Sequence, residues 1–346
     1  MDQFVEKKLD FTVFAPASYH FKYNGQENYL VQANCFNKID RLLFYYKYQK
    51  VYLSLLEKIR VQDYSILHAH SLFANGYIAY KIFQQYHIPY IVAVRNTDIN
   101  TFFKYFIYLR KLGIEILENA SKIVLISKAY KEKLLKYIPK EKATEIMAKC
   151  MVVPNGIDSY FLENKKQPKI WNKKDLNLVF TGRIDENKNL ITTIKCCNKI
   201  LKNEYSVKLT VIGSISSKRY NNILKKYDFI NYVGQKNKEE IVEIYKNMDI
   251  FVMPSKHETF GLVYVEAMTQ GLPVIYTKNE GFDQFFEDGE VGYPIIYNNY
   301  SEMAQKVELI MNNYEKMSQN CVKNSTSFNW KDIASTYIEM YKKIEQ

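Results

Sequence analysis

The sequence predicts an α/β protein built from two parallel-sheet domains. Short runs of β-branched and apolar residues alternate with longer amphipathic stretches, as in strand–helix units around a parallel sheet. The chain has 346 residues, of which 47% are apolar and 25% charged, which is ordinary globular composition and enough length for two domains. A polar stretch rich in Lys and Asn at 163–175 separates the two halves. We therefore expect one domain at 1–160 and a second that begins at 161.

The expected strands are short apolar runs, and each half has its own set. In the first half they are 11–15, 66–70, 90–94, 123–126 and 151–153. In the second half they are 176–181, 208–213, 230–233, 250–253, 273–276 and 293–296. Helical periodicity is clearest at 190–201, 238–247 and 262–270. Both domains are therefore Rossmann-like, and such folds bind ligands at the carboxyl ends of their strands.

The composition argues against several classes of protein. The five cysteines have neither Cys-x-x-Cys nor paired spacing, which disfavours a disulfide framework or a zinc knuckle and indicates reduced core residues. No uncharged apolar run approaches the roughly 18 residues of a membrane span. Residues 1–11 contain charged side chains where a signal peptide would be apolar. We expect a cytoplasmic protein.

Positive charge is concentrated in the first half of the chain. The formal net charge is +11, and residues 1–155 carry +9 of it. This indicates an anionic partner, such as nucleic acid, a bilayer surface or a phosphorylated substrate, although a compositional bias toward Lys gives the same count. Because 42 of the basic residues are Lys and only 6 are Arg, bidentate readout of base edges is disfavoured, and we expect no nucleic-acid partner.

The segment 36–60 interleaves Leu, Phe and Tyr with Lys and Arg. Such a segment can lie on an anionic membrane leaflet. It can equally form a helix packed on a sheet, with lysines that extend into solvent. The sequence is compatible with both interpretations.

The most informative stretch is PSKHETFGLVYVEAMTQG, which directly follows an expected strand. Glu258 falls in the strand-to-helix loop, and Glu266 lies inside a helix that begins near Gly261. The amides of Thr259, Phe260 and Gly261 then lie at a helix N-terminus, which favours anionic or hydroxyl-bearing ligands. Since a carboxylate accepts hydrogen bonds from two adjacent hydroxyls, the two acids suit sugar recognition. A solvated helix start with a surface Glu is the alternative.

Two further stretches occupy comparable positions. TGRIDENKN follows a strand and opens a helix, and it supplies Gly182 for a tight turn and Arg183 and Lys188 as cations. Arg grips a pyrophosphate bidentately and Lys adds a point charge beside it, whereas two solvated cations are the alternative. VPNGID, which contains Asn155, is a turn just before the linker.

Taken together in this order, these stretches resemble the retaining glycosyltransferases of family 4, which have the GT-B fold. The matching segments are VPNGID, FTGRIDENKNL, LTVIG, NYVGQKNKEEIVEIYKNMDIFVMPSKHETFGLVYVEAMTQGLPVI and SFNWKDIASTYIEMYKKI, and the resemblance covers nearly all of 66–346. It implies two facing Rossmann-like domains with a cleft between them. The domain at 1–160 would handle the acceptor, and the domain at 161–328 would bind a nucleotide-sugar. A helix at 329–346 would cross back to the N-terminal domain.

The resemblance also implies a role for each motif residue. Arg183 and Lys188 would hold the donor diphosphate and stabilise the leaving group, and Glu258 would contact hydroxyls of the donor sugar. Glu266 would bind the ribose hydroxyls. The other donor-binding candidates are Asn155, Gly182, Gly234, Thr259, Phe260, Gly261 and Leu262. The family needs no divalent metal and the sequence contains no Asp-x-Asp, so we expect neither a metal nor another cofactor.

The N-terminal half departs from the family pattern. The usual first strand and its glycine-rich loop are not visible, and Gly25 is a weak substitute, so we expect this domain to lack its first βα unit. A family His aligns with Arg95, which accepts no proton at pH 7 but can bind a donor oxygen, with Asp98 nearby; an Arg–Asp surface pair is the alternative. His68 and His70 share one face of a strand, where His70 is a cleft candidate and a satisfied core histidine is the alternative.

These observations predict an enzyme that transfers a sugar from a nucleotide diphosphate sugar, with UDP-sugars as the first choice, to a glycan or lipid-linked acceptor with retention of configuration. We expect a role in cell-surface polysaccharide biosynthesis, at the inner face of the plasma membrane. The rival hypothesis is a catalytically silent nucleotide-sugar-binding partner or scaffold, suggested by the missing first unit and by Arg95. A domain that is inactive alone would require a partner chain. The complete set of Arg183, Lys188, Glu258 and Glu266 favours the enzyme.

Overall fold

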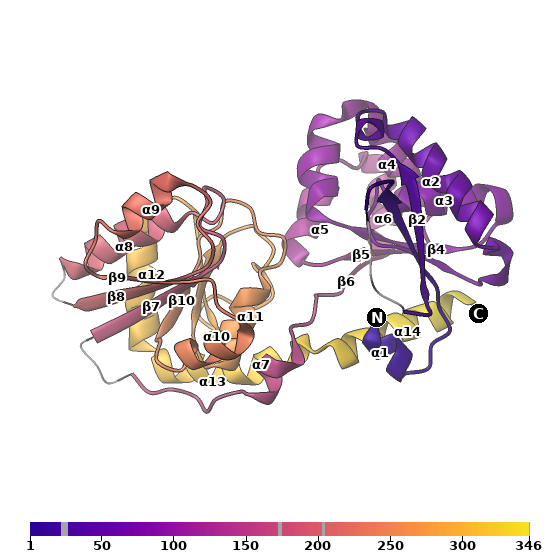
Figure 1. Cartoon of the computed structure of the whole chain (residues 1–346). Helices are drawn as coiled ribbons and strands as arrows, with labels where there is room; N and C mark the ends of the chain where they lie inside the picture. Colours follow the sequence, from indigo (N-terminus) through magenta and orange to yellow (C-terminus); the bar gives the residue numbers. More distant parts are fainter. Residues whose placement is uncertain (22–26, 172–174, 203–204, 346) are drawn as a thin grey trace. The chain divides into compact units, whose positions relative to one another are not determined.

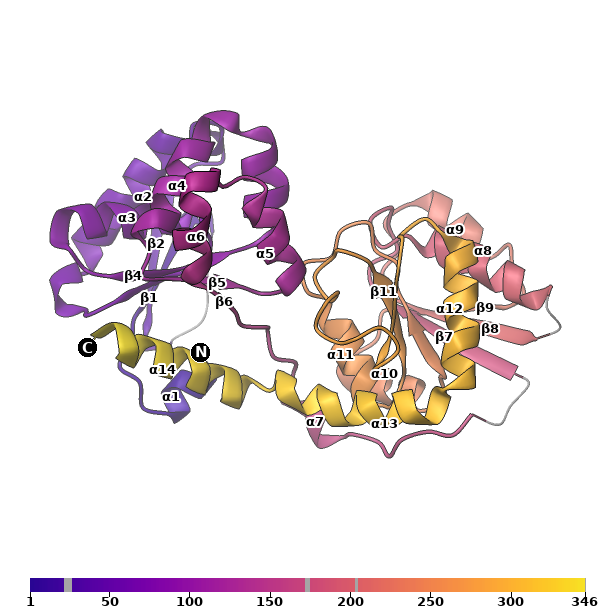
Figure 2. The same ribbon diagram turned by 180° about the vertical axis from the view of Figure 1, so that it is seen from behind.

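The computed structural model describes residues 1–21, 27–171, 175–202 and 205–345. The chain forms two compact units, which Figures 1 and 2 show from opposite sides. Unit 1 consists of Met1–Leu125, Lys133–Val152 and Ala334–Gln346, and unit 2 of Ile126–Glu132 and Val153–Ile333. Within the described ranges, no helix is both long enough and apolar enough to cross a bilayer.

Unit 1 contains two parallel sheets. β1 (Val13–Ser18) pairs with β2 (Leu30–Phe36), while β3 (Leu67–Ala69), β4 (Tyr90–Val94), β5 (Lys122–Leu125) and β6 (Cys150–Val152) form a second sheet in that order. The helices are α1 (Asp2–Glu6), α2 (Phe44–Lys58), α3 (Asn75–Tyr86), α4 (Arg110–Asn119), α5 (Lys128–Leu135), which begins in unit 2, and α6 (Lys140–Ala148). Shorter helical turns are Ile39–Leu42, Val61–Asp63, Asp98–Phe103 and Ile107–Leu109.

The four-stranded sheet has the properties of a sheet covered on both faces. Every residue of β4 is fully buried, as expected for a continuous apolar run in a parallel sheet. Helix α3 approaches this strand closely because Gly76 carries no side chain: a Cβ there would lie 2.9 Å from Val92 Cγ2. The four strands predicted for this part of the chain are confirmed.

The start of unit 1 differs from the prediction. Strand β2 was not predicted, because Gln32 and Asn34 interrupt its apolar pattern. It pairs in parallel with β1, with Val13 opposite Leu30, so unit 1 has one strand more than the sequence indicated. Gly25 lies outside the described residues.

Helix α2 forms most of the segment 36–60 and packs against β2 and α3. Its buried side chains are Phe44, Tyr48, Val51, Tyr52 and Leu55. For this helix the structure therefore agrees with the packed-helix interpretation. The residues that precede Phe44 are exposed, apart from Phe36 and Asp40.

Unit 2 is built around one six-stranded parallel sheet. Its strands are β7 (Asp175–Thr181), β8 (Ser206–Ile212), β9 (Ile230–Gly234), β10 (Ile250–Val252), β11 (Val274–Thr277) and β12 (Gly292–Ile295). Its helices are α7 (Ser159–Glu163), α8 (Leu190–Leu201), α9 (Lys218–Leu224), α10 (Lys238–Tyr245), α11 (Leu262–Thr269), α12 (Tyr300–Asn312), α13 (Tyr314–Ser325) and the start of α14 (Trp330–Glu345). Figure 1 shows α8 and α9 on one face of the sheet and α10 and α11 on the other. The strands and helices predicted for this half are confirmed.

The strand order of this sheet is β12-β11-β10-β7-β8-β9. Along the chain, β7 is followed by β8 on one side, whereas β10 is followed by β11 on the other. The direction of succession therefore reverses between β7 and β10. At such a switch point the connections leave toward opposite faces, and a crevice forms at the carboxyl ends of the two strands.

Helix α14 begins in unit 2, and its residues from Ala334 onward belong to unit 1. There the Tyr341 side chain packs against α1, with its ring 6.2 Å from the ring of Phe4. The Tyr341 hydroxyl is also 2.7 Å from His68 Nδ1. Both termini of the chain therefore belong to unit 1.

Candidate active site

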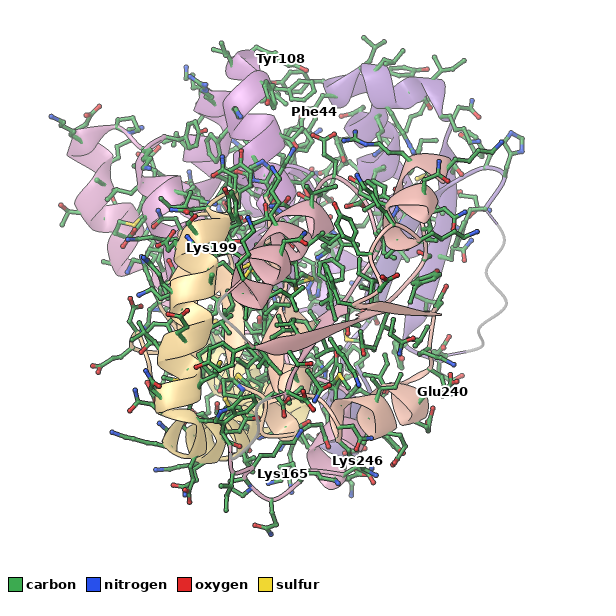
Figure 3. The ribbon with its side chains drawn as sticks, turned by 90° about the vertical axis from the view of Figure 1, so that its left-hand side faces the viewer. Phe44, Tyr108, Lys165, Lys199, Glu240 and Lys246 are labelled. Atoms are coloured by element: carbon green, nitrogen blue, oxygen red, sulfur yellow. The ribbon has the colours of Figure 1, made fainter. Side chains whose placement is uncertain are left out.

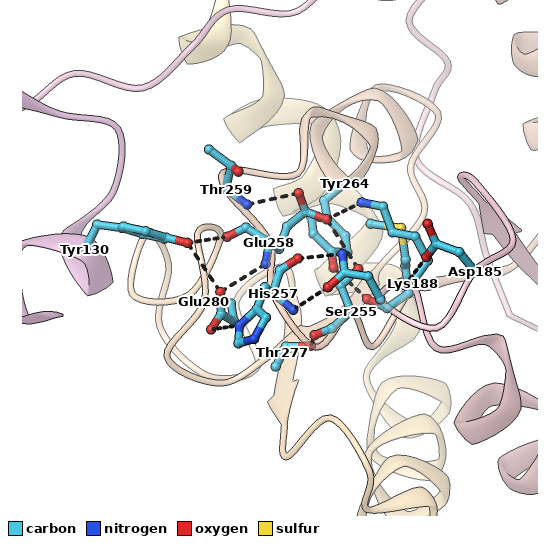
Figure 4. Close-up of polar contacts among 12 residues, drawn as sticks. Tyr130, Asp185, Lys188, Ser255, His257, Glu258, Thr259, Tyr264, Thr277 and Glu280 are labelled. Atoms are coloured by element: carbon cyan, nitrogen blue, oxygen red, sulfur yellow. Dashed lines mark hydrogen bonds and ion pairs between the residues drawn. The ribbon is translucent and has the colours of Figure 1, made fainter. Parts of the chain in front are cut away.

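Two loops meet at the switch point of the unit 2 sheet and are joined by an ion pair (Figure 4). The loop after β7 carries Lys188 and the loop after β10 carries Glu258, and Lys188 Nζ lies 2.6 Å from Glu258 Oε2. The two side chains are 23% and 11% exposed. The structure thus brings together two predicted site residues that are 70 positions apart, in the place where this fold class binds ligands.

Lys188 is positioned by a turn directly after β7. Its backbone N donates to Asp185 Oδ1 at 2.9 Å. The next residue, Asn189, has a left-handed φ of +57° and is the N-cap of α8. Its Nδ2 donates to Pro254 O at 3.0 Å. Asn189 therefore ties the Lys188 loop to the loop that carries Glu258.

The Glu258 carboxylate accepts from three donors. Besides Lys188, Ser255 Oγ donates to Oε2 at 3.3 Å and Thr259 N donates to Oε1 at 3.1 Å. These contacts fix the side chain with its two oxygens at the strand end. A hydroxyl-bearing ligand would compete for the same lone pairs, and Lys188 is the partner that can turn toward an anion instead.

Gly261 makes the turn from this loop into α11 feasible. Its φ is +83°, and a Cβ there would lie 2.3 Å from Tyr264 Cε2. The Tyr264 ring occupies this space, and its hydroxyl donates to Met253 O at 2.6 Å. The hydrogen bond closes the loop from its first residue to the first turn of the helix.

A second carboxylate, Glu280, holds the Glu258 loop from the other side. Glu258 N donates to Glu280 Oε2 at 2.9 Å, and Gly281 N donates back to Glu258 O at 2.9 Å. Glu280 Oε1 is 3.5 Å from His257 Nδ1. The Tyr130 hydroxyl, from the part of α5 that belongs to unit 2, lies 3.5 Å from Glu280 Oε2. Glu280 is 7% exposed, so it acts as an internal acceptor.

Sequence reasoning missed Glu280. It follows β11 in the stretch TKNEGF, which carries no recognisable spacing of functional residues. Its position was the one available indication: the stretch follows β11, the strand next to β10 in the sheet, so it lies at the same sheet edge as the Glu258 loop.

Arg183 lies at the exposed rim of the site. Its side chain is 68% exposed, and Nε lies 3.6 Å from Asp185 Oδ2. The other oxygen of Asp185 accepts from Lys188 N, so one carboxylate organises both predicted cations. Arg183 can therefore turn toward a ligand without breaking a buried contact.

Glycines close the ends of β7, β8 and β9. Gly182 N donates to Ile212 O at 3.0 Å, and Gly213 N donates to Gly234 O at 2.8 Å. A Cβ at Gly213 would lie 2.0 Å from Gly182 O, so only glycine fits there. Gly234 has a φ of +76° and nothing within 4 Å of its Cβ position, which leaves space beside the strand end.

Glu266 lies on α11 and is affected by the turn at 153–158. Burial, and secondarily the charge of Asp158, raise the pKa of Glu266 to about 7. Asp158 itself pairs with Lys238 at 2.9 Å. Asn155 is in the same turn and is half-buried. Glu266 can therefore change its charge near neutral pH.

Two predicted donor-binding residues differ in what they expose. The Phe260 side chain is 2% exposed and packs against the rings of Phe285 and Phe328. The predicted role of Phe260 depends on its backbone amide at the helix N-terminus, so burial of the ring leaves that prediction untested. Leu262 is half-buried in the first turn of α11.

Asp98 in unit 1 closes a loop. It is 2% exposed. Its Oδ2 accepts from Arg95 N at 2.8 Å and Leu72 N at 3.0 Å, and its Oδ1 accepts from Phe73 N at 3.2 Å. This corrects both the surface-pair interpretation and the cleft role of Asp98, because its oxygens are occupied by backbone donors.

His70 and Arg95 also lie together in unit 1. The rings of His68 and His70 stack at 4.4 Å, and Arg95 Nε donates to His70 O at 3.0 Å. Desolvation, and secondarily the Arg95 charge, lower the pKa of His70 to about 4. His70 is therefore neutral at pH 7 and can act there only as a neutral hydrogen-bonding group.

Neither a metal cluster nor a disulfide occurs in the part of the chain that the structure describes. No three His, Cys, Asp or Glu residues there form a group that could hold a metal, and the cysteines are free. Unit 1 contains a cavity of about 490 Å³, lined by Ala15, Pro16, Ala17, Ser18, Phe21, Leu30, Gln32, Phe36 and Arg41.

Comparison with known families accounts for both halves of the chain. Residues 162–328 match the sequence model of glycosyl transferases group 1, and residues 1–160 match that of Glycosyltransferase Family 4. The chain belongs to the group 1 glycosyltransferases of family 4. The resemblance inferred from its motifs is thereby confirmed.

Relatives and solved structures agree with this assignment. The capsular polysaccharide biosynthesis glycosyltransferase CapM of Staphylococcus aureus is 28% identical over 279 residues, which is 74% of this chain and 71% of CapM. The sucrose-phosphate synthase of Thermosynechococcus elongatus has a TM-score of 0.73 at 19% identity, covering 96% of this chain and 88% of that one. Anabaena HepE, solved with UDP, has a TM-score of 0.69 at 15% identity, covering 96% and 100%. The fold is therefore of the GT-B class.

The contacts of Glu280 predict a measurable effect of its removal. Glu280→Ala leaves the buried Glu258 N–H without its acceptor, which should lower the free energy of unfolding by about 1–3 kcal/mol. Because the Glu258 loop then loses its fixed position, glycosyl transfer should fall by about tenfold or more. Denaturant unfolding and initial rates measure the two effects. Glu280→Gln, which keeps an acceptor oxygen, should retain most of both; equal behaviour of Glu280→Ala and the exposed control Glu287→Ala would contradict the role.

The raised pKa of Glu266 predicts a pH-dependent stability. Because the folded pKa is about 7 and the ordinary value is 4.5, the folded state binds more protons between these pH values, and unfolding becomes easier as pH rises through them. Glu266→Gln should therefore be more stable than the unmodified protein at pH 8, by up to about 3 kcal/mol, and the difference should shrink as pH falls and vanish only below the ordinary pKa of 4.5. Urea titrations at several pH values test this, with the exposed Glu239→Gln as control. A difference that does not change between pH 5 and 8 would refute it.

Proposed function

We propose that this chain transfers a sugar from a nucleotide diphosphate sugar to a glycan or lipid-linked acceptor with retention of the anomeric configuration. The observation that carries the proposal is the Lys188–Glu258 pair at the switch point of the unit 2 sheet. It combines a cation for a diphosphate with a carboxylate for sugar hydroxyls. Membership of a glycosyltransferase family supports the reaction class.

Proteins similar to this chain support the choice of substrates. HepE has been solved with UDP and with UDP-glucose, which makes UDP-sugars the first donors to test. CapM is named for capsular polysaccharide biosynthesis, which supports a cell-surface glycan as the product.

The chemistry follows from how charge develops in the reaction. As the bond between sugar and diphosphate breaks, negative charge grows on the diphosphate. Lys188 and Arg183 can stabilise this charge more strongly in the transition state than in the ground state, together with the amides at the N-terminus of α11. These two cations supply the positive charge that a divalent ion would otherwise bring, so we propose metal-independent transfer, with activity unchanged by EDTA.

The observed ion pair also suggests how the donor is received. A diphosphate would attract the Lys188 ammonium away from Glu258. The released Glu258 oxygens could then accept from sugar hydroxyls, while Ser255 and Thr259 keep the carboxylate in place. Each charged group exchanges one partner for another, so neither is left buried and unpaired.

The role of Lys188 predicts a large loss of turnover in its absence. Lys188→Met, which keeps the side-chain length but removes the charge, should lower kcat by about 100-fold, as the loss of one preorganised transition-state contact does. Initial rates with a nucleotide-sugar donor measure this. Lys195→Ala, an exposed cation on α8, should leave the rate unchanged. A Lys188→Met enzyme with an unaltered rate would remove the assignment.

Donor binding is tested by thermal unfolding against a panel of nucleotide diphosphates and their sugars, with release of free nucleotide measured in the same samples. A bound nucleotide stabilises the folded state by about 2.7 kcal/mol at a hundredfold excess over Kd. We expect the largest shift with UDP or a UDP-sugar, accompanied by slow release. A shift without transfer to any acceptor would instead favour the silent binding protein, and absence of any shift would contradict both.

A further inference from the structure

Two segments of unit 1 expose large apolar side chains and are linked through a series of aromatic rings. The first lies at the turn Ile39–Leu42 and the start of α2, and the second at residues 105–108, just before α4. The exposed members are Ile39, Leu42, Leu43, Tyr45, Tyr46, Tyr105, Phe106, Ile107 and Tyr108. We call this set the apolar patch. Leu42 is 81% exposed and Ile107 66%, values that a folded chain rarely gives to neighbouring large apolar side chains.

A continuous series of aromatic contacts joins the two segments. The ring of Phe44 is 6.3 Å from that of Phe102, Phe102 is 5.4 Å from Phe106, and Phe106 is 6.1 Å from Tyr108. Figure 3 labels Phe44 and Tyr108, the two ends of this series. Since Phe44 is buried, it anchors the exposed residues to the core beneath them.

The second segment is held in a defined conformation. Arg110 Nε donates to Phe103 O at 2.7 Å, and its Nη2 donates to Lys104 O at 3.3 Å. Leu109 is fully buried at the end of the turn. These contacts fix the backbone on both sides of residues 105–108 and present their side chains outward.

The patch is bordered by positive charge. Segments 36–47 and 101–111 contain six basic residues and one acidic residue. The acidic residue, Asp40, is buried and already paired with Lys50 at 2.9 Å. The basic residues are Lys38, Arg41, Lys47, Lys104, Arg110 and Lys111. An apolar surface with aromatic members and a cationic border matches the anionic headgroup region of a bilayer, where Tyr side chains and basic residues are favoured.

We propose that the apolar patch binds unit 1 to an anionic lipid bilayer. A second copy of the chain is a poorer occupant, because two cationic borders would repel each other. Arg41 belongs both to the border and to the lining of the 490 Å³ cavity, so membrane binding would also bring that cavity close to lipid. The inference goes beyond the proposed transfer reaction, and lipid binding can be measured without it.

The experiment compares binding of the full chain to vesicles of phosphatidylcholine containing about 30% phosphatidylglycerol with binding to phosphatidylcholine alone. We expect sedimentation with the anionic vesicles only, weakening as salt is raised. The double variant Leu42→Ser/Ile107→Ser removes one exposed side chain from each segment, so it should lose binding by about tenfold or more. Its matched control is Ile170→Ser/Ile296→Ser, two exposed isoleucines of unit 2, which should bind as the unmodified protein does.

A second pair of variants tests the charged border. Lys38→Gln/Lys104→Gln should weaken binding to anionic vesicles by about fivefold for each charge removed, whereas Lys195→Gln/Lys316→Gln should not. Equal retention of patch and control variants, or no binding by the unmodified chain, would overturn the proposal. So would a patch variant that changes the oligomeric state while vesicle binding stays the same, because the occupant would then be a second copy. Nucleotide-induced thermal shifts of the same variants report on the donor site separately.

Discussion

The ion pair between Lys188 and Glu258 is a consequence of strand order. The sheet of unit 2 reverses its succession between β7 and β10, so the loops that follow these two strands leave in opposite directions above adjacent strand ends. Every other feature of the site supports this contact. Asn189 ties one loop to the other, Gly261 lets the second loop turn into α11, and Glu280 fixes its backbone. A different strand order would separate the two charges, whatever the local sequence.

Acidic residues at this edge have separate tasks because their surroundings differ. Glu258 accepts from a cation, a hydroxyl and an amide, and its side chain remains at the surface of the crevice. Glu280 is turned inward and accepts a backbone N–H, so it acts on the position of Glu258. Among the described residues Glu266 has no comparable set of donors, and burial therefore raises its pKa to about 7. The chemistry of each acid is set by how many donors its environment supplies.

The sequence predicts those features of the fold and the site that depend on local residue pattern. Apolar runs placed the strands of unit 2, and the spacing around Lys188 and Glu258 placed both residues in strand-to-helix loops. It could not predict Glu280, because that contact joins two loops that no motif links. It could not predict which way the Phe260 side chain points, because the rings of Phe285 and Phe328 that pack against it come from distant parts of the chain. Strand β2 was not predicted because polar Gln32 and Asn34 break the continuous apolar run that marked the other strands.

The segment 36–60 also combines a part that local pattern explains with a part that depends on contacts distant in sequence, although its composition is similar throughout. Leu, Tyr and Lys alternate throughout it, but burial separates the residues at Phe44. From there onward the apolar side chains of one face pack on β2 and α3, and the helix explains them. Just before Phe44, Ile39, Leu42 and Leu43 have no such cover, and the Phe44 ring beside them contacts Phe102, which is far away in sequence. Composition does not distinguish the two parts. In the folded chain the part from Phe44 onward contributes side chains to the core, whereas the part just before it is exposed. Packing of the core does not account for the exposed apolar side chains, so they are better explained by a binding partner. The basic residues around them favour a partner with an anionic surface.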